Sequence, residues 1–202
     1  MKTIIFDFDG TMVDSAQLVW DCLLSYTSNT QLTWEELRDL SSENVIKALK
    51  IPKIKLPGLI LKIRRKFRLR LMSQKVPDGV LEAIRALNQR GFDLHIISSN
   101  SEENIRVFLK HHHILQCFKS INSCFTIFGK ARSLSNLLKI IGVASEAAIY
   151  IGDETRDIEA AKKAGMKSMA VCWGYNSEKA LRLYDPTFLA REPIDIVNLL
   201  EA

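Results

Sequence analysis

The chain has 202 residues, of which 47% are hydrophobic and 25% are charged, and its formal net charge is +5. This length allows one substantial core, or one core with a small appended domain. No apolar run reaches the ~18 residues of a membrane span, and Met1 leads into an apolar segment without the charged n-region of a signal peptide. The four cysteines form no CxxC pair, which argues against a disulfide framework or a zinc site. We therefore expect a cytoplasmic protein.

The first apolar run ends in the sequence DFDGT, so that Asp7 and Asp9 follow four apolar or β-branched residues. From about Asp14 to residue 78 the apolar residues recur at helical spacing, and no strand pattern is visible. Thr33 and Ser42 are the candidate N-caps within this segment. The pattern predicts a block of helices directly after one strand.

The rest of the chain alternates between strand and helix patterns. We expect strands over 92–98, 147–152 and 167–173, and helices over 76–91, 101–114, 130–142, 155–165, 177–184 and 193–202. Short, continuously apolar strands between helices are typical of a parallel sheet that is covered on both faces. The sequence therefore predicts an α/β, doubly wound (Rossmann-like) core made of 1–12 plus 79–202, with a small helical cap domain, 13–78, inserted after the first strand.

Polar side chains follow several of the expected strands. One strand ends in Ser98-Ser99-Asn100-Ser101, another in GDETRD with Asp153 and Asp157, and Lys130 precedes a helix between them. In such sheets ligands bind beyond the carboxyl ends of the strands. These groups and the two N-terminal carboxylates are therefore expected along one edge of the sheet.

Phosphoryl transfer through an aspartyl intermediate needs this set of groups. One carboxylate attacks phosphorus, and Mg²⁺ offsets the repulsion between the two anions. A second carboxyl group protonates the leaving alcohol and then activates water. A hydroxyl and an ammonium group hold the oxygens of the transferring phosphoryl group.

The motifs DFDGT, VDS, IISSN, GK and YIGDETRDIEAAKKAG resemble those of the haloacid dehalogenase superfamily, most closely its phosphoglycolate phosphatase-like branch. The resemblance spans the whole chain. It implies a Mg²⁺-dependent phosphatase that acts on a small phosphomonoester, such as phosphoglycolate or a sugar phosphate, with a cap that selects the substrate. The implied partner is a small phosphorylated metabolite, and neither nucleic acid nor a membrane is expected as a partner. The chain is expected to be a monomer or a homodimer.

The resemblance also implies roles for individual residues. Asp7 would be the nucleophile and Asp9 the acid/base, and both would bind the metal together with Asp153. The resemblance implies contacts to the phosphate group for Thr11, Ser99, Asn100 and Lys130. Asp157 would be a carboxylate that orients a metal-bound water. Glu154 stands where relatives often carry a smaller polar residue, and is either an additional metal or water contact or a helix N-terminal charge.

A basic stretch lies within the expected cap. Residues 44–77 contain eleven Lys or Arg and no Asp or Glu. On a helix, Ile60, Ile63, Phe67 and Leu71 share one stripe that should pack into the cap. Arg64 and Arg70 flank this stripe, and either one turned toward the cleft could bind a second anionic group of the substrate, because guanidinium binds such groups in bidentate fashion. The competing interpretation is a solvated surface.

Three alternative functions stay open at this point. A dehalogenase on the same fold would have no leaving alcohol to protonate, so Asp9 argues against it. A phosphomutase would pass the phosphoryl group to a second position of a sugar, which the sequence does not distinguish from hydrolysis. A phospho-accepting regulator also uses clustered carboxylates, but the helical insertion and the position of Asp9 argue against it.

Overall fold

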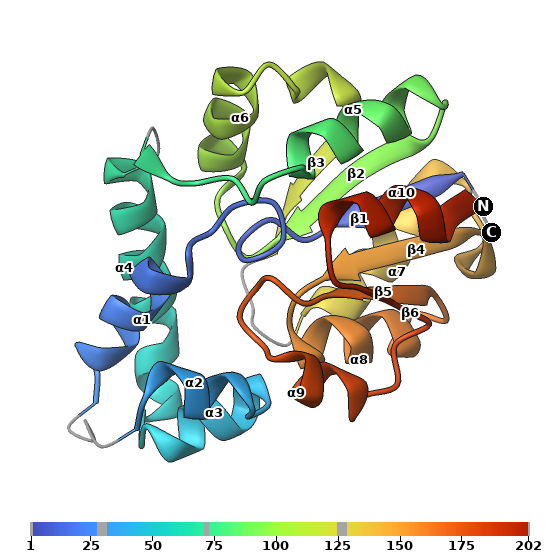
Figure 1. The fold of residues 1–202 in the computed structure, drawn as a ribbon. Helices are drawn as coiled ribbons and strands as arrows, with labels where there is room; N and C mark the ends of the chain where they lie inside the picture. The colour runs from blue at the N-terminus through green and yellow to red at the C-terminus, as the bar shows by residue number, and fades with distance from the viewer. Residues whose placement is uncertain (1, 28–31, 71–72, 125–128, 202) are drawn as a thin grey trace.

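The structure is a computed structural model that describes residues 2–27, 32–70, 73–124 and 129–201 (Figure 1). Six parallel strands form one sheet in the order β3-β2-β1-β4-β5-β6. The strands are β1 (Thr3–Phe6), β2 (Asp93–Ser98), β3 (Phe118–Ser123), β4 (Ala148–Gly152), β5 (Lys167–Val171) and β6 (Phe188–Ala190). The chain steps outward from β1 to β3 and resumes at β4 on the other side of β1. The strand order therefore reverses beside β1, where doubly wound sheets bind their ligands.

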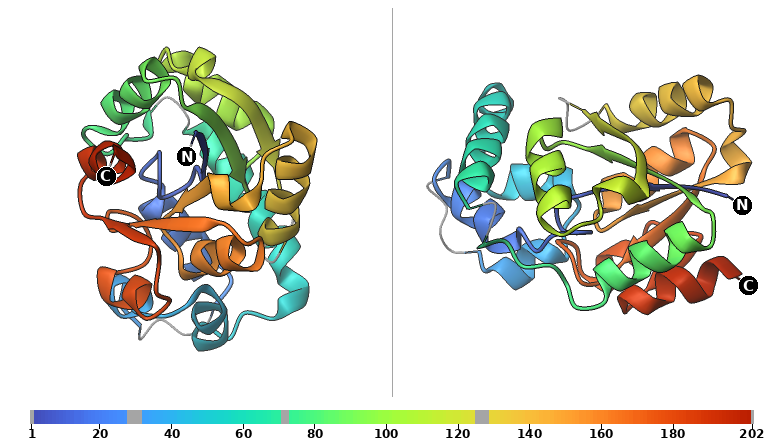
Figure 2. Two further views of the ribbon diagram at one scale, coloured as in Figure 1. Left: turned by 90° about the vertical axis from the view of Figure 1, so that its right-hand side faces the viewer. Right: turned by 90° about the horizontal axis from the view of Figure 1, so that it is seen from above.

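Helices cover both faces of this sheet. Side chains alternate between the faces of a strand, so Ile4 and Phe6 of β1 join the core cluster under α5, α6 and α10, whereas Ile5 joins the cluster under α7 and α8. The two views of Figure 2 show these layers. The helices are α5 (Val80–Gln89), α6 (Glu102–His111), α7 (Lys130–Ile141), α8 (Thr155–Lys163), α9 (Glu178–Arg182) and α10 (Pro193–Glu201).

In the described part of the segment between β1 and α5, four α-helices lie on the carboxyl-end side of the sheet (Figure 1). They are α1 (Ala16–Leu24), α2 (Trp34–Arg38), α3 (Ser42–Ala48) and α4 (Leu56–Leu69). A β-bridge joins the two ends of this segment, since the amide of Asp14 donates to the carbonyl of Lys75 over 2.9 Å. All four helices fall within the 13–78 segment that we call the cap. The division of the chain into a core and a cap domain stays a prediction.

The predicted α/β fold class is confirmed, with differences in detail. The sequence patterns did not predict β3 and β6. The sequence of β3, FKSINS, is largely polar and lies at a sheet edge, and β6 has only three residues. The predicted N-cap Thr33 accepts from the amide of Glu36, but α3 is capped by Ser41, so Ser42 is its first helical residue.

Aromatic side chains pack the cap against the core. Phe8, after β1, contacts Phe67 of α4 and Phe108 of α6, with ring centroids 5.7 and 5.2 Å apart. Leu56, Leu59 and Phe67 are the buried apolar side chains of α4, and the predicted stripe member Leu71 lies outside the described residues.

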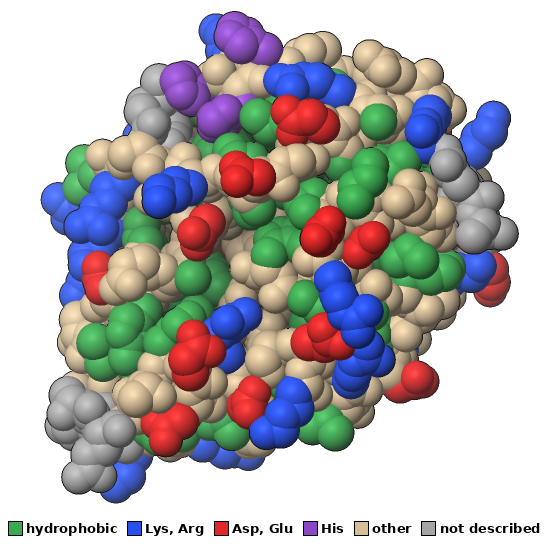
Figure 3. All heavy atoms as spheres, viewed as in Figure 1, with side chains coloured by type: hydrophobic (Ala, Val, Ile, Leu, Met, Phe, Trp, Pro, Cys, Tyr) green, Lys and Arg blue, Asp and Glu red, His purple; other side chains and the backbone are tan. Residues whose placement is uncertain are grey.

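The exposed face of the cap is basic. Lys and Arg side chains gather along the edge of the molecule that α4 forms (Figure 3), where Arg65, Arg68 and Arg70 are exposed. Among the described helices, none has both the length and the apolar character needed to cross a membrane. The cytoplasmic location and the oligomeric state stay predictions.

Candidate active site

The turn after β1 brings Asp7 and Asp9 to the carboxyl edge of the sheet. The amide of Asp7 donates to the carbonyl of Ile151 over 2.8 Å, which continues the pairing of β1 with β4. Gly10 follows with a φ of 79°, and a Cβ added there would lie 2.1 Å from Oδ2 of Asp153. Only glycine fits this left-handed conformation and this close approach. The DG pair of DFDGT thus allows the turn to pack directly against the end of β4.

Lys130, the first residue of α7, joins two of the acids. Its Nζ lies 2.5 Å from Oδ2 of Asp7 and 2.5 Å from Oδ1 of Asp157, and all three side chains are 3% exposed. Burial alone would lower the pKa of Lys130, but the carboxylates of Asp157 and Asp7 outweigh it and hold this pKa well above its usual value. The ammonium is therefore charged at every physiological pH. Burial raises the pKa of Asp157 to about 6, against the opposing effect of Lys130.

Asp9 is held by a chain of polar side chains. The Asn100 amide donates to both of its oxygens over 3.2 and 3.1 Å, and the Ser15 hydroxyl donates to Oδ1 over 3.1 Å. Ser15 in turn contacts the Tyr175 hydroxyl at 2.5 Å. Burial and the nearby charge of Asp7 raise the pKa of Asp9 to about 7. A carboxyl group with this pKa can both donate and accept a proton near neutral pH.

The loop between β4 and α8 supplies Asp153 and Glu154. Asp153 is fully buried, and its oxygens accept from the Thr11 hydroxyl and from the Tyr175 amide, each over 2.7 Å. Burial, together with the charge of Glu154 and other neighbouring acids, holds the pKa of Asp153 well above its usual value. Glu154 pairs with Arg156 and accepts from the Ser42 hydroxyl of the cap over 2.6 Å.

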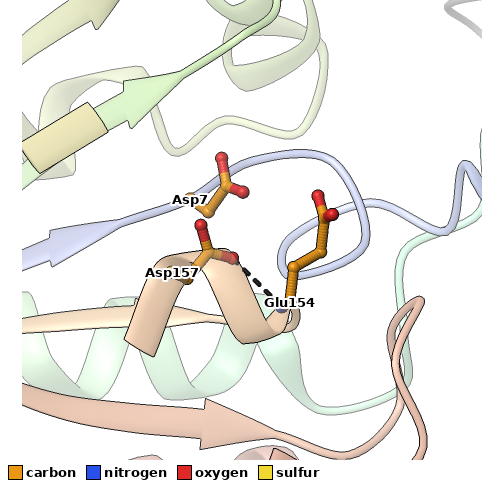
Figure 4. Close-up of side chains that lie close together, drawn as sticks. All are labelled: Asp7, Glu154 and Asp157. Carbon is orange, nitrogen blue, oxygen red and sulfur yellow. Dashed lines mark hydrogen bonds between the residues drawn. The ribbon is translucent and has the colours of Figure 1, made fainter. Parts of the chain in front are cut away.

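Among the described residues, one acidic group has the geometry to hold a metal ion. Carboxylate oxygens of Asp7, Glu154 and Asp157 lie within 4.8 Å of one another. Figure 4 shows Asp7 at the end of β1 above the start of α8, where the Glu154 amide donates to Asp157 over 3.1 Å. The predicted metal set of Asp7, Asp9 and Asp153 differs from this group.

The number of buried acids fits a divalent cation. Five buried carboxylates meet here, from Asp7, Asp9, Asp153, Glu154 and Asp157. In the described part of the chain, the cations in contact with them are Lys130 and Arg156. Hard oxygen donors are the ligands that Mg²⁺ prefers, and an additional positive charge would offset the remaining negative charge.

A cavity of about 150 Å³ lies over these carboxylates, between the core and the cap. From the core it is lined by Asp7, Asp9, Ser99, Glu154, Arg156, Tyr175 and Asn176. From the cap it is lined by Val19, Leu23, Trp34, Leu37, Arg38, Ser42, Val45, Ile46, Leu59, Ile60 and Ile63.

Comparison with known proteins places this arrangement in a family. The family model of haloacid dehalogenase-like hydrolases matches residues 4–171. The chain belongs to this family. It is similar to phosphoglycolate phosphatases of Synechococcus elongatus (32% identity over 98% of this chain and 96% of the relative) and Aquifex aeolicus (30% identity over 100% and 97%). Its fold is similar to that of a predicted phosphatase from Clostridium acetobutylicum, with a TM-score of 0.81, 20% identity, and coverage of 100% and 99% of the two chains.

Membership of this hydrolase family confirms the predicted family and the prediction of an enzyme. The structure also brings the predicted core residues together at one edge of the sheet, although two of them have partners that differ from those expected. The hydroxyl of Thr11 donates to Asp153, and the side-chain amide of Asn100 donates to Asp9. Ser99 lines the cavity, whereas Ser98 is fully buried and its hydroxyl accepts from the backbone amide of Asn100. The catalytic and phosphate-binding roles of these residues stay predictions.

Arg64 and Arg70, the two cap arginines predicted as possible substrate contacts, are not among the residues that line the cavity. The Arg64 guanidinium lies against the loop after β2, where it donates to the carbonyls of Ser99 and Asn100 and to the Ser123 hydroxyl. Arg70 lies on the surface, 3.9 Å from Asp21. Arg64 thus ties the cap to the loop after β2 of the core, and the suggested substrate contact by either arginine has no support from this arrangement.

The sequence did not point to Tyr175, although the rule that found the other residues applies to it. Tyr175 follows the carboxyl end of β5, and its amide, hydroxyl and carbonyl contact Asp153, Ser15 and Arg38, respectively. Its ring also lies edge-on to Trp34 of the cap, with centroids 6.3 Å apart. Tyr175 therefore joins Asp153 directly, and Asp9 through Ser15, to the cap.

Proposed function

We propose that this chain is a Mg²⁺-dependent phosphatase that hydrolyses a small phosphomonoester through an aspartyl-phosphate intermediate. The observation that carries the proposal is the pairing of Asp7 with Asp9 in the wall of the cavity between the core and the cap. Asp7 lies against a buried ammonium group, and Asp9 has a pKa of about 7. One acid is thus paired with a positive charge, and the other can carry a proton.

In the first step, an oxygen of Asp7 attacks phosphorus, and the bond from phosphorus to the alcohol oxygen breaks. Asp9 gives its proton to that oxygen, so that a neutral alcohol leaves. One oxygen of Asp7 already accepts from the amide of Phe8 over 2.8 Å. This bond and the one to Lys130 fix the plane of the attacking carboxylate.

In the second step, Asp9 takes a proton from water as the water oxygen attacks phosphorus. The bond between phosphorus and Asp7 breaks, which releases phosphate and restores both acids. Lys130, which contacts the attacking carboxylate, and Ser99, which lines the cavity, would stabilise the oxygens of the transferring phosphoryl group. Asn100 and Ser15 orient Asp9 in both steps through their hydrogen bonds to its carboxyl group.

By the family resemblance, Asp7 and Asp153 with the backbone carbonyl of Asp9 would hold Mg²⁺. Carboxylate oxygens of Glu154 and Asp157 lie within 4.8 Å of an oxygen of Asp7 and could also contribute. Bound there, the ion would reduce the electrostatic repulsion between the substrate phosphate and the attacking carboxylate. A dehalogenase would not need Asp9, since no alcohol leaves. Hydrolysis of a phosphate ester accounts for both acids.

We expect the metal to be essential. Excess chelator should abolish phosphate release from p-nitrophenyl phosphate, and Mg²⁺ should restore it. Asp153→Asn should raise the Mg²⁺ concentration needed for half-maximal activity, and Asp157→Asn should cost activity on the order of 10–100-fold, as residues that orient metal ligands do. Glu159→Gln is a matched control, because Glu159 is an exposed acid on the same helix as Asp157. Full activity in chelator would refute the metal requirement.

A second prediction concerns Tyr175 as a positioning residue. Tyr175→Phe removes the hydroxyl that contacts Ser15 and should leave Ser15 free to rotate away from Asp9. Proton delivery to a poor leaving group should then suffer, whereas nitrophenolate leaves without a proton. We expect kcat for an alkyl phosphate to fall by about tenfold and kcat for p-nitrophenyl phosphate by less than about threefold. Equal losses for the two substrates would indicate a purely structural role.

A further inference from the structure

The two walls of the active-site cavity differ in chemistry. The core supplies acids, Arg156, the hydroxyls of Ser99 and Tyr175 and the side-chain amide of Asn176. The cap supplies mostly apolar groups: two apolar side chains from each of α1, α2 and α3, and three from α4. In a phosphomonoester bound with its phosphorus at Asp7, the alcohol part has to face this second wall. We propose that the natural substrate has a small, uncharged and mainly apolar alcohol part. This inference rests on the proposed phosphatase function and narrows its substrate class.

The polar cap residues that line the cavity already have partners in the core. Arg38 donates from Nε to the carbonyl of Tyr175 over 3.2 Å and from Nη2 to the carbonyl of Gly174 over 3.3 Å, while Nη1 lies 3.5 Å from Glu35. Ser42 donates to Glu154 over 2.6 Å. These contacts hold the cap in place and leave the substrate facing the apolar side chains.

A second anionic group on the substrate would find no suitable counter-ion at the cap. Arg38 is the one basic cap residue among the described residues that line the cavity. The other basic side chain that lines it, Arg156, comes from the core wall, where one of its terminal nitrogens pairs with Glu154 beside the acidic cluster, while its buried Nε has no hydrogen-bond partner among the described residues. A carboxylate placed against Trp34, Ile60 and Ile63 would lose its hydration without gaining a partner, which is unfavourable.

The volume of the cavity limits the size of the alcohol. At about 150 Å³ it is smaller than the roughly 300–1,000 Å³ of sites for drug-sized ligands. The phosphate must also occupy part of this volume. A short alkyl or single-ring alcohol fits these limits, whereas a nucleoside does not.

The test compares two esters of the same shape. Phosphoglycolate and isobutyl phosphate both carry a branched group of four non-hydrogen atoms on the ester oxygen, and only the first group is charged. With Mg²⁺, we expect kcat/KM of the wild-type enzyme to be at least about tenfold higher for isobutyl phosphate, because the carboxylate of phosphoglycolate would lie against the apolar side chains of the cap. We expect this preference even though isobutanol is a poorer leaving group than glycolate. A higher kcat/KM for phosphoglycolate would overturn the inference.

A charge added to the cap wall tests the same point by gain of function. Ile63→Lys places an ammonium group in the cavity wall and should raise the ratio of kcat/KM for phosphoglycolate to that for isobutyl phosphate by about tenfold or more. Leu61→Lys is the matched control on α4, since Leu61 is 59% exposed and does not line the cavity. Ile60→Lys is a second variant on the wall, and circular dichroism checks that each variant is folded.

The outcomes separate this inference from the proposed function. Suppose that the enzyme releases phosphate from p-nitrophenyl phosphate but prefers phosphoglycolate, or has no activity on isobutyl phosphate. The proposed phosphatase function would then stand, and the inference of an apolar alcohol part would be refuted. An unchanged ratio in both folded wall variants would also refute it. No Mg²⁺-dependent release from any of the three esters would refute the phosphatase function itself, and the inference with it.

Discussion

Asp7→Asn should reduce Mg²⁺-dependent phosphate release from p-nitrophenyl phosphate by a factor on the order of 10³ or more, since loss of a nucleophile costs on the order of 10⁶ in a serine protease. The substitution keeps the shape of the side chain and removes its charge. An amide oxygen can still accept from the amide of Phe8, but the amide nitrogen cannot also accept from Lys130 as Oδ2 does. Asp7→Glu should be similarly inactive, because the added methylene displaces the carboxylate from its line of attack.

The control for this variant is Asp14→Asn. Asp14 lies seven residues further along the chain in the same turn region, is exposed, and is absent from the cavity lining. It should keep activity within about twofold, as surface substitutions usually do. Asp7→Asn with more than about 1% of the wild-type rate would refute the aspartyl intermediate, because the residual rate would need another nucleophile.

The residues at the strand ends could be predicted because two simple rules coincide. Parallel strands all present their carboxyl ends at one edge, and apolar runs that stop at Asp7, Ser99 and Asp153 mark those ends in the sequence. No packing detail is needed for this step. The same rule did not single out Tyr175, because its links to Asp153 and Ser15 join residues far apart in the sequence and form only in the folded chain. It also could not include β3, since its partly exposed, polar sequence has no apolar pattern.

Contacts between the cap and the core could not be predicted in the same way. Arg64 lies on the buried side of α4 and donates to the carbonyl of Ser99, whereas helical periodicity placed it only at the border of the apolar stripe. The direction of such a side chain depends on how the cap is oriented over the core. That orientation is set by packing such as Phe8 against Phe67, between residues far apart in the sequence. Arg64 and Ser42 therefore acquire their partners only in the folded chain.

Lys130→Met should reduce both stability and activity. It leaves Asp7 and Asp157 buried and facing each other without the cation that joins them. Removing one partner of a buried ion pair costs about 3–5 kcal/mol. In a chain of this length each kcal/mol lowers Tm by roughly 2–4 °C, so Tm should fall by roughly 6–20 °C. Loss of the charge near the transferring phosphoryl group should also lower kcat/KM by about 10²–10³-fold.

Lys139→Met and Lys130→Arg separate the causes of these losses. Lys139 is exposed on the same helix, so its substitution should leave Tm and kcat/KM almost unchanged. Lys130→Arg keeps the charge, but a guanidinium group is too broad to lie 2.5 Å from both carboxylates in the same way. It should therefore recover part of the lost stability and little of the activity. If Lys130→Met kept Tm within about 1 °C and kcat/KM within about threefold, then the ammonium group would neither stabilise the acidic cluster nor take part in phosphoryl transfer.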